Sequence, residues 1–303
     1  MCKVDGLRAF RRLAGFCLLI GMACSVQAED YSEDTRKYDH LWMNWHLYRG
    51  IDQRGGPYKF DDTYFEIEFG GRSGIVAIYG YVDILDILGS SHSDKNKQDN
   101  FFAKVSPRIS LDGLFGKDLA IGPIVEWYLS FTLNAMDGDK YELDENDKVI
   151  DKNGGGQNLW VGFGADVMVP WLGKTGVDFY KRYVYDNYGA SNERSWDGYV
   201  LHANWFKPLK MLDGDRMIAF QGYFDWEFDS KIPKNENAFE KAYRTDDSFQ
   251  AYLGLWYHDK HWGAGYGAKL YHHMTQWKNG EVLNGKKTDS NGVGHYFNVF
   301  YRF

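Results

Sequence analysis

Cysteine is scarce in this 303-residue sequence, and its distribution is informative. The three cysteines, Cys2, Cys17 and Cys24, all lie within the first 24 residues. If this N-terminal segment is removed, the mature protein has no thiol, which excludes disulfide bonds and cysteine chemistry. The mature fold must then depend on packing and hydrogen bonding alone.

Long apolar runs are also missing. Beyond residue 23, no stretch approaches the roughly 18 apolar residues that a transmembrane helix needs. The chain has no basic surplus either, because 35 Lys and Arg face 42 Asp and Glu, for a formal net charge of −7. A nucleic-acid-binding protein normally carries a basic patch or stripe, so the composition argues against a nucleic-acid polymer as partner.

Residues 1–28 have the organisation of a secretory signal peptide. Four basic residues lie between Lys3 and Arg12, and the apolar segment Leu13 to Ala23 that follows is too short to span a bilayer. Val26-Gln27-Ala28 offers a small-residue cleavage site. Cleavage would remove four basic residues and one acidic residue and leave 31 basic against 41 acidic, a net charge of −10. The alternatives are a retained anchor and a lipoprotein modified at Cys24.

What the chain has in abundance is aromatic residues, at 17% of the total, and they follow a two-residue period. In Val125 to Asn134, apolar side chains alternate with polar or amphipathic ones such as Glu126, and Asn158 to Met168 and Met217 to Phe228 repeat the alternation. Such segments fit strands with one face in lipid and one in a polar lumen. A soluble β-sandwich would also alternate. Its strands, however, average roughly 5–6 residues, whereas a tilted bilayer-spanning strand needs about ten.

The pattern predicts an all-β protein, a single transmembrane antiparallel β-barrel of twelve strands over residues 41–303, after a polar lead-in at residues 29–40. The expected strands run near 41–49, 63–71, 75–86, 101–110, 121–134, 157–168, 176–186, 196–206, 217–228, 248–257, 262–273 and 294–303. Long polar connections are expected at 50–62, 87–100, 135–156, 187–195, 229–247 and 274–293, and short ones between the remaining strands. Bacterial barrels place short turns in the periplasm, so both termini are expected there. The predicted location is the outer membrane of a Gram-negative bacterium.

Several stretches of the sequence carry a family resemblance. They are Phe65 to Asp83, Pro107 to Leu119, Gly122-Pro123, Glu126 to Tyr128, Asp166 to Lys174, Asn187 to Tyr199, Phe224 to Trp226 and the terminal Phe303. Together they resemble the Tsx and OmpK family of outer-membrane channels. The segments GGRSGI and DVMVPWLGK look more like OmpK, whereas NYGASNE and SWDGY are similar to Tsx. The resemblance to Tsx implies a narrow monomeric channel for nucleosides and deoxynucleosides that also serves as a phage or colicin receptor at its extracellular loops. The resemblance to OmpK implies a phage receptor and does not fix the cargo.

The inward faces of the predicted strands carry aromatic rings and charges that suit a nucleoside. Rings can stack on a base, and carboxylates, Lys and Arg can hydrogen-bond its edges and the ribose. The candidate lumen residues are Glu66, Glu68, Tyr79, Tyr81, Asp83, Phe102, Arg108, Glu126, Tyr128, Tyr223, Asp225 and Lys269. Charges that are costly in lipid must face inward in any case, so structural lining is favoured over cargo contact for any single residue, and the group as a whole is the better candidate.

Metal and catalytic sites are not expected. His272 and His273 are neighbours in a predicted strand and should point to opposite faces, which argues against a shared ion. Asp137 to Asp151 is acidic but lacks the glycine spacing of a calcium loop. Carboxylate pairs such as Glu66 and Glu68 follow from the polar face of a strand. We therefore predict no catalytic residue, no cofactor and no enzymatic activity.

Three functions compete at this point. The first is selective passive diffusion of nucleosides through a monomeric barrel embedded in outer-membrane lipid and lipopolysaccharide. The second is a phage-receptor or adhesion barrel whose outer loops, 135–156 and 229–247 among them, matter more than its lumen. The third is an outer-membrane lipase or protease. Flux measurements with nucleosides and with sugars of similar size separate the first two.

Overall fold

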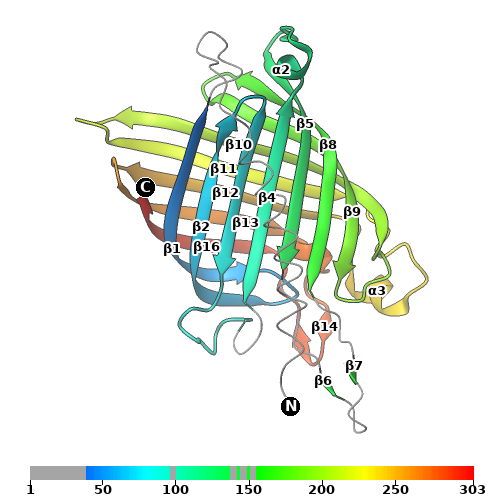
Figure 1. Cartoon of the computed structure of the whole chain (residues 1–303). Coiled ribbons are helices and arrows are strands. Elements are labelled where there is room, and N and C mark those ends of the chain that lie inside the picture. The colour runs from blue at the N-terminus through cyan, green and yellow to red at the C-terminus, as the bar shows by residue number, and fades with distance from the viewer. Residues whose placement is uncertain (1–38, 96–99, 137–141, 144–148, 151–154) are drawn as a thin grey trace.

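The computed structural model describes residues 39–95, 100–136, 142–143, 149–150 and 155–303. Twelve long antiparallel strands close into one barrel, in which each strand pairs with its sequence neighbours and β16 returns to β1 (Figure 1). The predicted twelve-stranded barrel is confirmed. The predicted signal peptide and all of the lead-in except Asp39 and His40 lie outside the described residues. Within the described part of the chain, no helix is long and apolar enough to cross a membrane.

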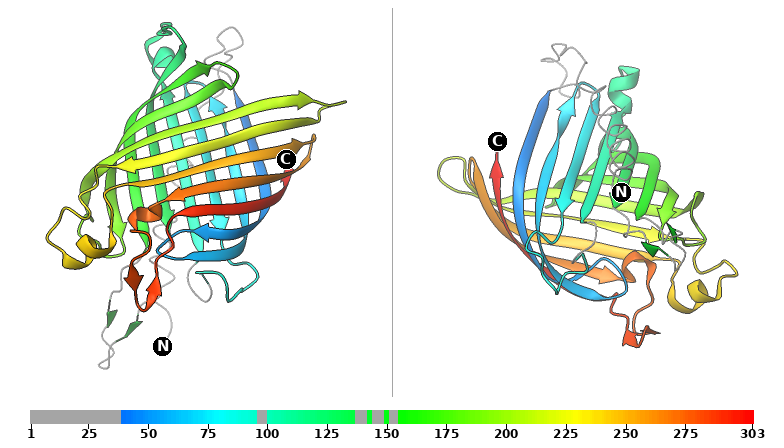
Figure 2. Two further views of the ribbon diagram at one scale, coloured as in Figure 1. Left: turned by 180° about the vertical axis from the view of Figure 1, so that it is seen from behind. Right: turned by 60° about the horizontal axis from the view of Figure 1, so that its bottom comes forward.

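The barrel strands are mostly longer than the sequence pattern predicts. They are β1 (His40–Arg54), β2 (Lys59–Ser73), β3 (Val76–Ile84), β4 (Phe101–Ser110), β5 (Ile124–Met136), β8 (Gly156–Val169), β9 (Gly173–Asn187), β10 (Ser195–Met211), β11 (Met217–Phe228), β12 (Ser248–His258), β13 (Trp262–His272) and β16 (Gly292–Arg302). The left view of Figure 2 shows the later strands, yellow to red, crossing obliquely in front of the earlier ones, as the walls of a tilted barrel do.

Short elements decorate the connections between these strands. They are the helix α2 (Leu111–Phe115), the helix α3 (Ala238–Tyr243), the 3-10 turn η1 (Met274–Gln276) and the two-residue strands β6 (Glu142–Leu143), β7 (Val149–Ile150), β14 (Val282–Leu283) and β15 (Lys286–Lys287). Figure 1 shows α2 at one end of the barrel and α3 with both small hairpins at the other. The period-two pattern predicts none of these elements.

The burial pattern is inverted relative to a soluble protein. Phe163, Phe179 and Phe297 are 64%, 49% and 50% exposed on the outer face, whereas Asp178 and Asp225 are each 2% exposed inside. An outer surface of large apolar rings would be costly in water, but it is what a lipid-facing barrel wall requires. Closure pairs the two edges of the sheet, so no edge strand is left open in the hydrocarbon region.

The predicted connection at residues 50–62 is wrong. Strands β1 and β2 continue as a ladder that pairs Gln53 with Phe60 and Arg54 with Lys59, so only four residues link them. This extension is strongly polar, and Lys59 Nζ lies 2.9 Å from Asp52 Oδ1. The sequence pattern missed it because a strand beyond the bilayer has no lipid face and therefore no apolar alternation.

The long connections at the α3 end are held together by a buried polar cluster. Asp197, which is fully buried, accepts hydrogen bonds from Arg182 Nη2 at 3.0 Å, Asn192 Nδ2 at 2.5 Å and Ser230 Oγ at 2.7 Å. The backbone N–H of Lys231 also donates to this carboxylate. The cluster ties the 188–194 connection and the 229–247 connection to the barrel rim.

Helix α3 adds a second tie between the same connections. Glu240, 3% exposed, accepts hydrogen bonds from the backbone N–H of Ser191 at 2.7 Å and from its hydroxyl. The Arg244 guanidinium lies 4.4 Å from the ring centroid of Trp277, which belongs to the next connection. Burial lowers the pKa of Arg244 to about 10. These connections therefore form a packed surface rather than separate loops.

Candidate lumen lining

The strand register places all twelve predicted lumen residues on the inner face of the barrel. Glu66 pairs with Asp83, which pairs with Phe102, and Glu68 pairs with Tyr81. The same inner-face alternation continues around the ladder through Arg108, Glu126, Tyr128, Tyr223, Asp225 and Lys269 and returns to β1 and β2. The sequence alternation therefore locates the residues, while their roles depend on what each contacts.

Glu126 lies in a closed polar network near the short turns. Arg72 approaches its carboxylate through two guanidinium nitrogens, at 2.9 and 2.8 Å. The Ser110 hydroxyl donates to Glu126 Oε1 at 2.5 Å, and the Tyr128 hydroxyl lies 2.6 Å from Oε2. Such a bidentate pair with supporting hydroxyls is strong and geometrically fixed. Glu126 has its hydrogen-bonding capacity largely filled by the protein.

Arg108 is held beside this network by two further carboxylates. Its Nη1 donates to Asp166 Oδ1 at 2.8 Å, and its Nε lies 3.2 Å from Asp178 Oδ1. The guanidinium carbon lies 3.9 Å from the ring centroid of Tyr128, a cation–π contact. Ser130 donates to Asp178 at 2.6 Å. The arginine, the tyrosine and three carboxylates thus form one compact electrostatic unit.

Asp225 is the centre of a second group, farther along the lumen. Lys104 Nζ lies 3.3 Å from Oδ2, His202 Nδ1 lies 2.6 Å from Oδ1, and Gln250 donates to Oδ2 at 3.0 Å. The side chain is 2% exposed. Like Glu126, this carboxylate is satisfied by protein groups.

Tyr223 projects from the same strand into a group of rings and lysines. Its ring is stacked against Tyr252 with centroids 6.0 Å apart and planes at 17°. Lys104 and Lys269 lie 5.8 and 5.6 Å from its centroid. Lys104 also lies 5.0 Å from the ring of Trp160. Rings and ammonium groups thus alternate around the inner wall.

Lys269 differs from the other lumen cations in having neither an ion pair nor a side-chain hydrogen bond within the described ranges of the chain. Arg302, which also lacks an ion pair there, donates to Asn44 Oδ1 at 3.2 Å. Among the described residues, Lys104, Arg108, Arg72 and Arg182 each have a carboxylate within 4 Å, and Lys269 has none. Its ammonium lies 5.5 Å from the ring centroid of Tyr271. Three N–H donors of a charged group therefore face the lumen without an ion-pair partner in the described chain.

Glu68 and Tyr79 form a third group. The carboxylate of Glu68 accepts from Asn44 Nδ2 at 2.9 Å and from the Tyr79 hydroxyl at 3.0 Å, and lies 3.1 Å from His46 Nε2. Tyr79 in turn contacts Tyr81 edge-on, with centroids 6.2 Å apart. The ring series continues from Tyr81 to Phe102 at 5.8 Å.

Sequence reasoning missed several side chains that complete these groups. They are His46, Arg72, Asp178 and His202, which provide the partners of Glu68, Glu126, Arg108 and Asp225. His46, Asp178 and His202 lie at inner positions of the strand alternation, so the same period could have identified them. Arg72 was expected in a turn, whereas it lies in β2 and pairs with His40.

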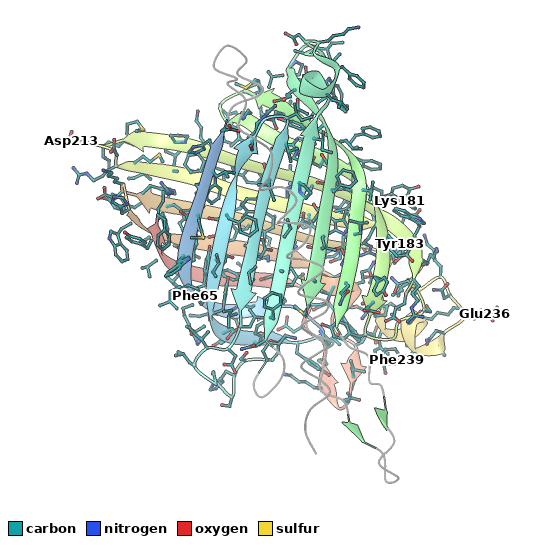
Figure 3. The ribbon with its side chains drawn as sticks, viewed as in Figure 1. Phe65, Lys181, Tyr183, Asp213, Glu236 and Phe239 are labelled. Atoms are coloured by element: carbon teal, nitrogen blue, oxygen red, sulfur yellow. The ribbon has the colours of Figure 1, made fainter. Side chains whose placement is uncertain are left out.

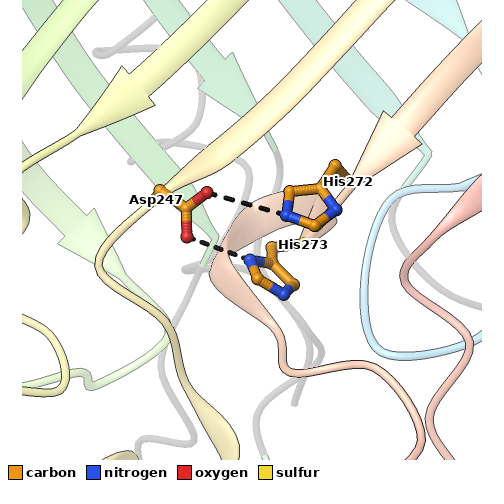
Figure 4. Close-up of side chains that lie close together, drawn as sticks. All are labelled: Asp247, His272 and His273. Atoms are coloured by element: carbon orange, nitrogen blue, oxygen red, sulfur yellow. Dashed lines mark hydrogen bonds and ion pairs between the residues drawn. The ribbon is translucent and has the colours of Figure 1, made fainter.

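The expectation that His272 and His273 point apart is wrong. His272 ends β13, and His273 adopts a left-handed backbone conformation with φ of 48°, so the strand alternation stops between them. Their ring centroids lie 3.9 Å apart, and both rings face Asp247 (Figure 4). A left-handed residue directs its side chain away from the direction that an extended strand would give it.

The sequence of the chain matches a known family over the whole barrel. The model of the nucleoside-specific channel-forming protein Tsx matches residues 37–303. The chain belongs to this family. As a Tsx-family barrel it is located in the outer membrane, and its family is one of channel-forming proteins rather than enzymes.

Two relatives found by sequence, OmpK and Tsx, agree with this assignment. The chain is 36% identical to outer membrane protein OmpK of Vibrio parahaemolyticus over 294 residues, which cover 97% of the chain and 99% of the relative. It is 31% identical to the nucleoside-specific channel-forming protein Tsx of Klebsiella aerogenes over 296 residues, which cover 93% and 96% of the two chains. The solved NanC porin aligns with 86% of the chain and 100% of its own length at 11% identity and a TM-score of 0.42.

Proposed function

We propose that this Tsx-family barrel is an outer-membrane channel for selective passive diffusion of nucleosides and deoxynucleosides. The observation that carries the proposal is the wall around Tyr223, where stacked rings alternate with the ammonium groups of Lys104 and Lys269. A nucleoside offers the complementary surfaces, an aromatic base and a hydroxyl-rich sugar. The name of the Klebsiella relative, a nucleoside-specific channel-forming protein, supports the same cargo.

The contacts divide the candidate residues by what they can offer a cargo. Arg108, Glu126 and Asp225 already bind protein partners at 2.5 to 3.3 Å, so their proposed role is to shape and neutralise the wall. Tyr223 and Lys269 are half-buried on the inner face, have no ion pair or side-chain hydrogen bond among the described residues, and are the proposed cargo contacts. A base stacked on a ring gains about 1–3 kcal/mol, and the ammonium donates hydrogen bonds to ribose or base oxygens.

Glu66, Asp83, Tyr81 and Phe102 are proposed to extend this surface. Glu66 and Asp83 are cross-strand partners, and Tyr81 and Phe102 continue the ring series on the neighbouring pairs. Several weak contacts in sequence allow a cargo to enter and also to leave, whereas one tight site would trap it. No energy source is required, because diffusion follows the concentration gradient.

Flux through the purified barrel in liposomes tests the proposal. We expect adenosine to enter faster than a sugar of similar size. Tyr223→Leu should reduce that preference, because it removes a stacking surface. Tyr266→Leu is the matched control, since Tyr266 is 42% exposed on the outer face. Equal rates for adenosine and the sugar in the wild type would refute nucleoside selectivity.

A receptor role for the outer connections is the second candidate, and a specific surface favours it. Phe239 of α3 is 47% exposed, and its ring lies 4.9 Å from Tyr243 and 6.2 Å from Trp277. Figure 3 places Phe239 and Glu236 at the end opposite Asp213. An exposed aromatic group on a packed scaffold suits protein recognition, by a phage or colicin for example. Phe239→Ala should reduce such adsorption and leave flux unchanged.

The orientation and assembly of the channel complete the proposal. The short turns, and with them the described ends at Asp39 and Phe303, would face the periplasm, and the α3 end would face outward among lipopolysaccharide. Each barrel would conduct as a monomer, because a single chain closes the ring of strands by itself. Protease digestion of intact cells checks the orientation, since only outward connections should be cut.

A further inference from the structure

A compact group of metal-ligating side chains lies at the α3 end, outside the lumen. Asp247 immediately precedes β12, and His272 is the last residue of β13, so the Phe249–His272 pair of the ladder brings the two together. His273 Nδ1 lies 2.9 Å from Asp247 Oδ1, and His272 Nε2 lies 3.9 Å from Asp247 Oδ2 (Figure 4). One ligand atom from each of the three residues lies within 4.8 Å of the others.

These separations suit a shared ion. Zinc binds imidazole nitrogen and carboxylate oxygen at about 2.0–2.2 Å, so neighbouring ligand atoms in a tetrahedral site lie roughly 3.3–3.6 Å apart. The observed 2.9 and 3.9 Å distances bracket that spacing. These two distances run to different oxygens of Asp247, and one ligand atom from each residue lies within 4.8 Å of the others. A metal between these atoms therefore requires shifts of up to about 1 Å, in side chains that are 24% to 52% exposed.

The backbone on both sides holds the group in place. The N–H of His273 donates to Asn291 Oδ1 at 2.7 Å, and the N–H of Met274 donates to the Ser290 carbonyl at 3.1 Å. The N–H of Thr245 donates to the Gln276 carbonyl at 3.0 Å, which links the segment before Asp247 to the segment after His273. The ligands are therefore ordered before any ion arrives, which lowers the entropic cost of binding.

The charge balance of the group is also favourable. Among the described residues, no Lys or Arg forms an ion pair with Asp247, while the nearby Lys234 pairs with Asp229 at 2.6 Å and with Asp246 at 3.8 Å. In the described part of the chain, the two histidines are therefore the only basic side chains within 4 Å of the Asp247 carboxylate. Two histidines and one carboxylate are a ligand set used by zinc sites that keep an open position.

We propose that Asp247, His272 and His273 bind one divalent transition-metal ion, of the Zn²⁺ class, at the outer rim of the barrel. The fourth position faces solvent, because His272 is half-exposed. The bound ion links the 229–247 connection to the 273–291 connection. Binding therefore makes the outward surface more rigid without entering the lumen, which separates this site from the proposed transport route.

Calorimetric titration of the full barrel in detergent with ZnCl₂ tests the proposal, using protein without a polyhistidine tag. We expect one ion per chain in the wild type. His272→Ala and Asp247→Asn should each weaken Zn²⁺ binding at least about tenfold. Loss of a residue that only hydrogen-bonds to a metal ligand already lowers metal affinity roughly 10- to 100-fold, and loss of a ligand should cost no less. His92→Ala is the matched control, because His92 is an exposed histidine in a connection at the same end.

Two further measurements keep the result unambiguous. Zn²⁺ should raise the midpoint of thermal unfolding in the wild type and in His92→Ala, because a ligand that binds only the folded state stabilises it. The His272→Ala/His273→Ala double variant should lose that shift while its circular dichroism stays that of a barrel. Absence of stoichiometric binding in the wild type, or its survival in the double variant, would overturn the proposal and leave a simple Asp–His ion pair.

Discussion

At the scale of single residues, the lumen contains two kinds of charge. Glu126, Asp178 and Asp225 are buried and bound by several protein donors, so each is part of the wall. Lys269 lies between two rings without an ion pair in the described chain. A satisfied charge contributes mainly to the structure, whereas an unsatisfied one remains free to bind a solute or to steer ions.

The Arg72–Glu126 pair allows a test of whether a buried ion pair in the wall stabilises the barrel. Arg72→Met should lower the free energy of unfolding by about 3–5 kcal/mol, because it leaves a buried carboxylate without its cation. Adding Glu126→Gln should recover part of that loss, since the uncompensated charge is removed as well. Guanidinium unfolding of the barrel in detergent measures the free energy of unfolding of the single and the double variants. A double variant as unstable as the sum of the single ones would show that the two residues are not coupled.

Lys269 allows a test of whether an unpaired lumen cation affects the ion selectivity of the channel. Lys269→Met removes a lumen cation that interacts electrostatically with Glu66 and Asp83 from beyond ion-pair distance, so the channel should become more selective for cations. The reversal potential of a planar bilayer under a salt gradient reports this change. Lys181→Met is the control, because Lys181 lies on the outer face, over the ring of Tyr199 at 3.9 Å (Figure 3). Equal shifts in the two variants would argue against a special role for Lys269.

At the scale of elements, the connections at the α3 end are ordered by a few buried carboxylates. Glu240→Ala should free the 188–194 connection from α3, because Glu240 binds both the N–H and the hydroxyl of Ser191. Trypsin should then cut the connections several-fold faster and leave the barrel core resistant. Glu236→Ala, an exposed change in the same connection, should have no effect. Unchanged cleavage in Glu240→Ala would mean that other contacts hold these segments.

Much of the strand architecture could be predicted because lipid imposes a simple rule on sequence. Phe101–Ser110 and Met217–Phe228 begin and end where the alternation predicts. The alternation of apolar and polar residues no longer predicts the structure for segments that lie outside the lipid. The polar extension of β1 and β2 to Arg54 and Lys59 has no apolar face to reveal it, and the left-handed His273 breaks the period without a glycine to mark it.

The candidate site was predictable in position but not in its contacts. Alternation places Asp225 on the inner face, yet only the closed ladder brings Lys104 to it from 121 residues away. Likewise, His46 reaches Asn298 across the seam at a separation of 252 residues. A local period contains no information on such partners, because they depend on strand order, register and tilt together.

At the scale of the whole molecule, closure of the barrel depends on the pairing of β1 with β16, in which Leu47 lies opposite Val299. A Leu47→Cys/Val299→Cys variant should form a disulfide under mild oxidation, since directly opposed Cβ atoms lie about 4.5–5.5 Å apart. The pair Leu47→Cys/Phe297→Cys is the control, because diagonal positions lie roughly 7–8 Å apart. Gel mobility after oxidation detects the disulfide that links β1 to β16. Preferential linkage of the control pair would contradict the β1–β16 register.

The same seam has a consequence for the order of assembly. A hairpin contact such as Phe249 with His272 joins residues close in sequence, whereas the seam joins His46 to Asn298, 252 positions away. Loop-closure entropy makes the seam contact about 2 kcal/mol more costly to form than the hairpin contact. We therefore expect the hairpins to form first and the ring to close last. Until that final step, a nascent chain has two unpaired strand edges, and this is the interval in which it is most prone to aggregate.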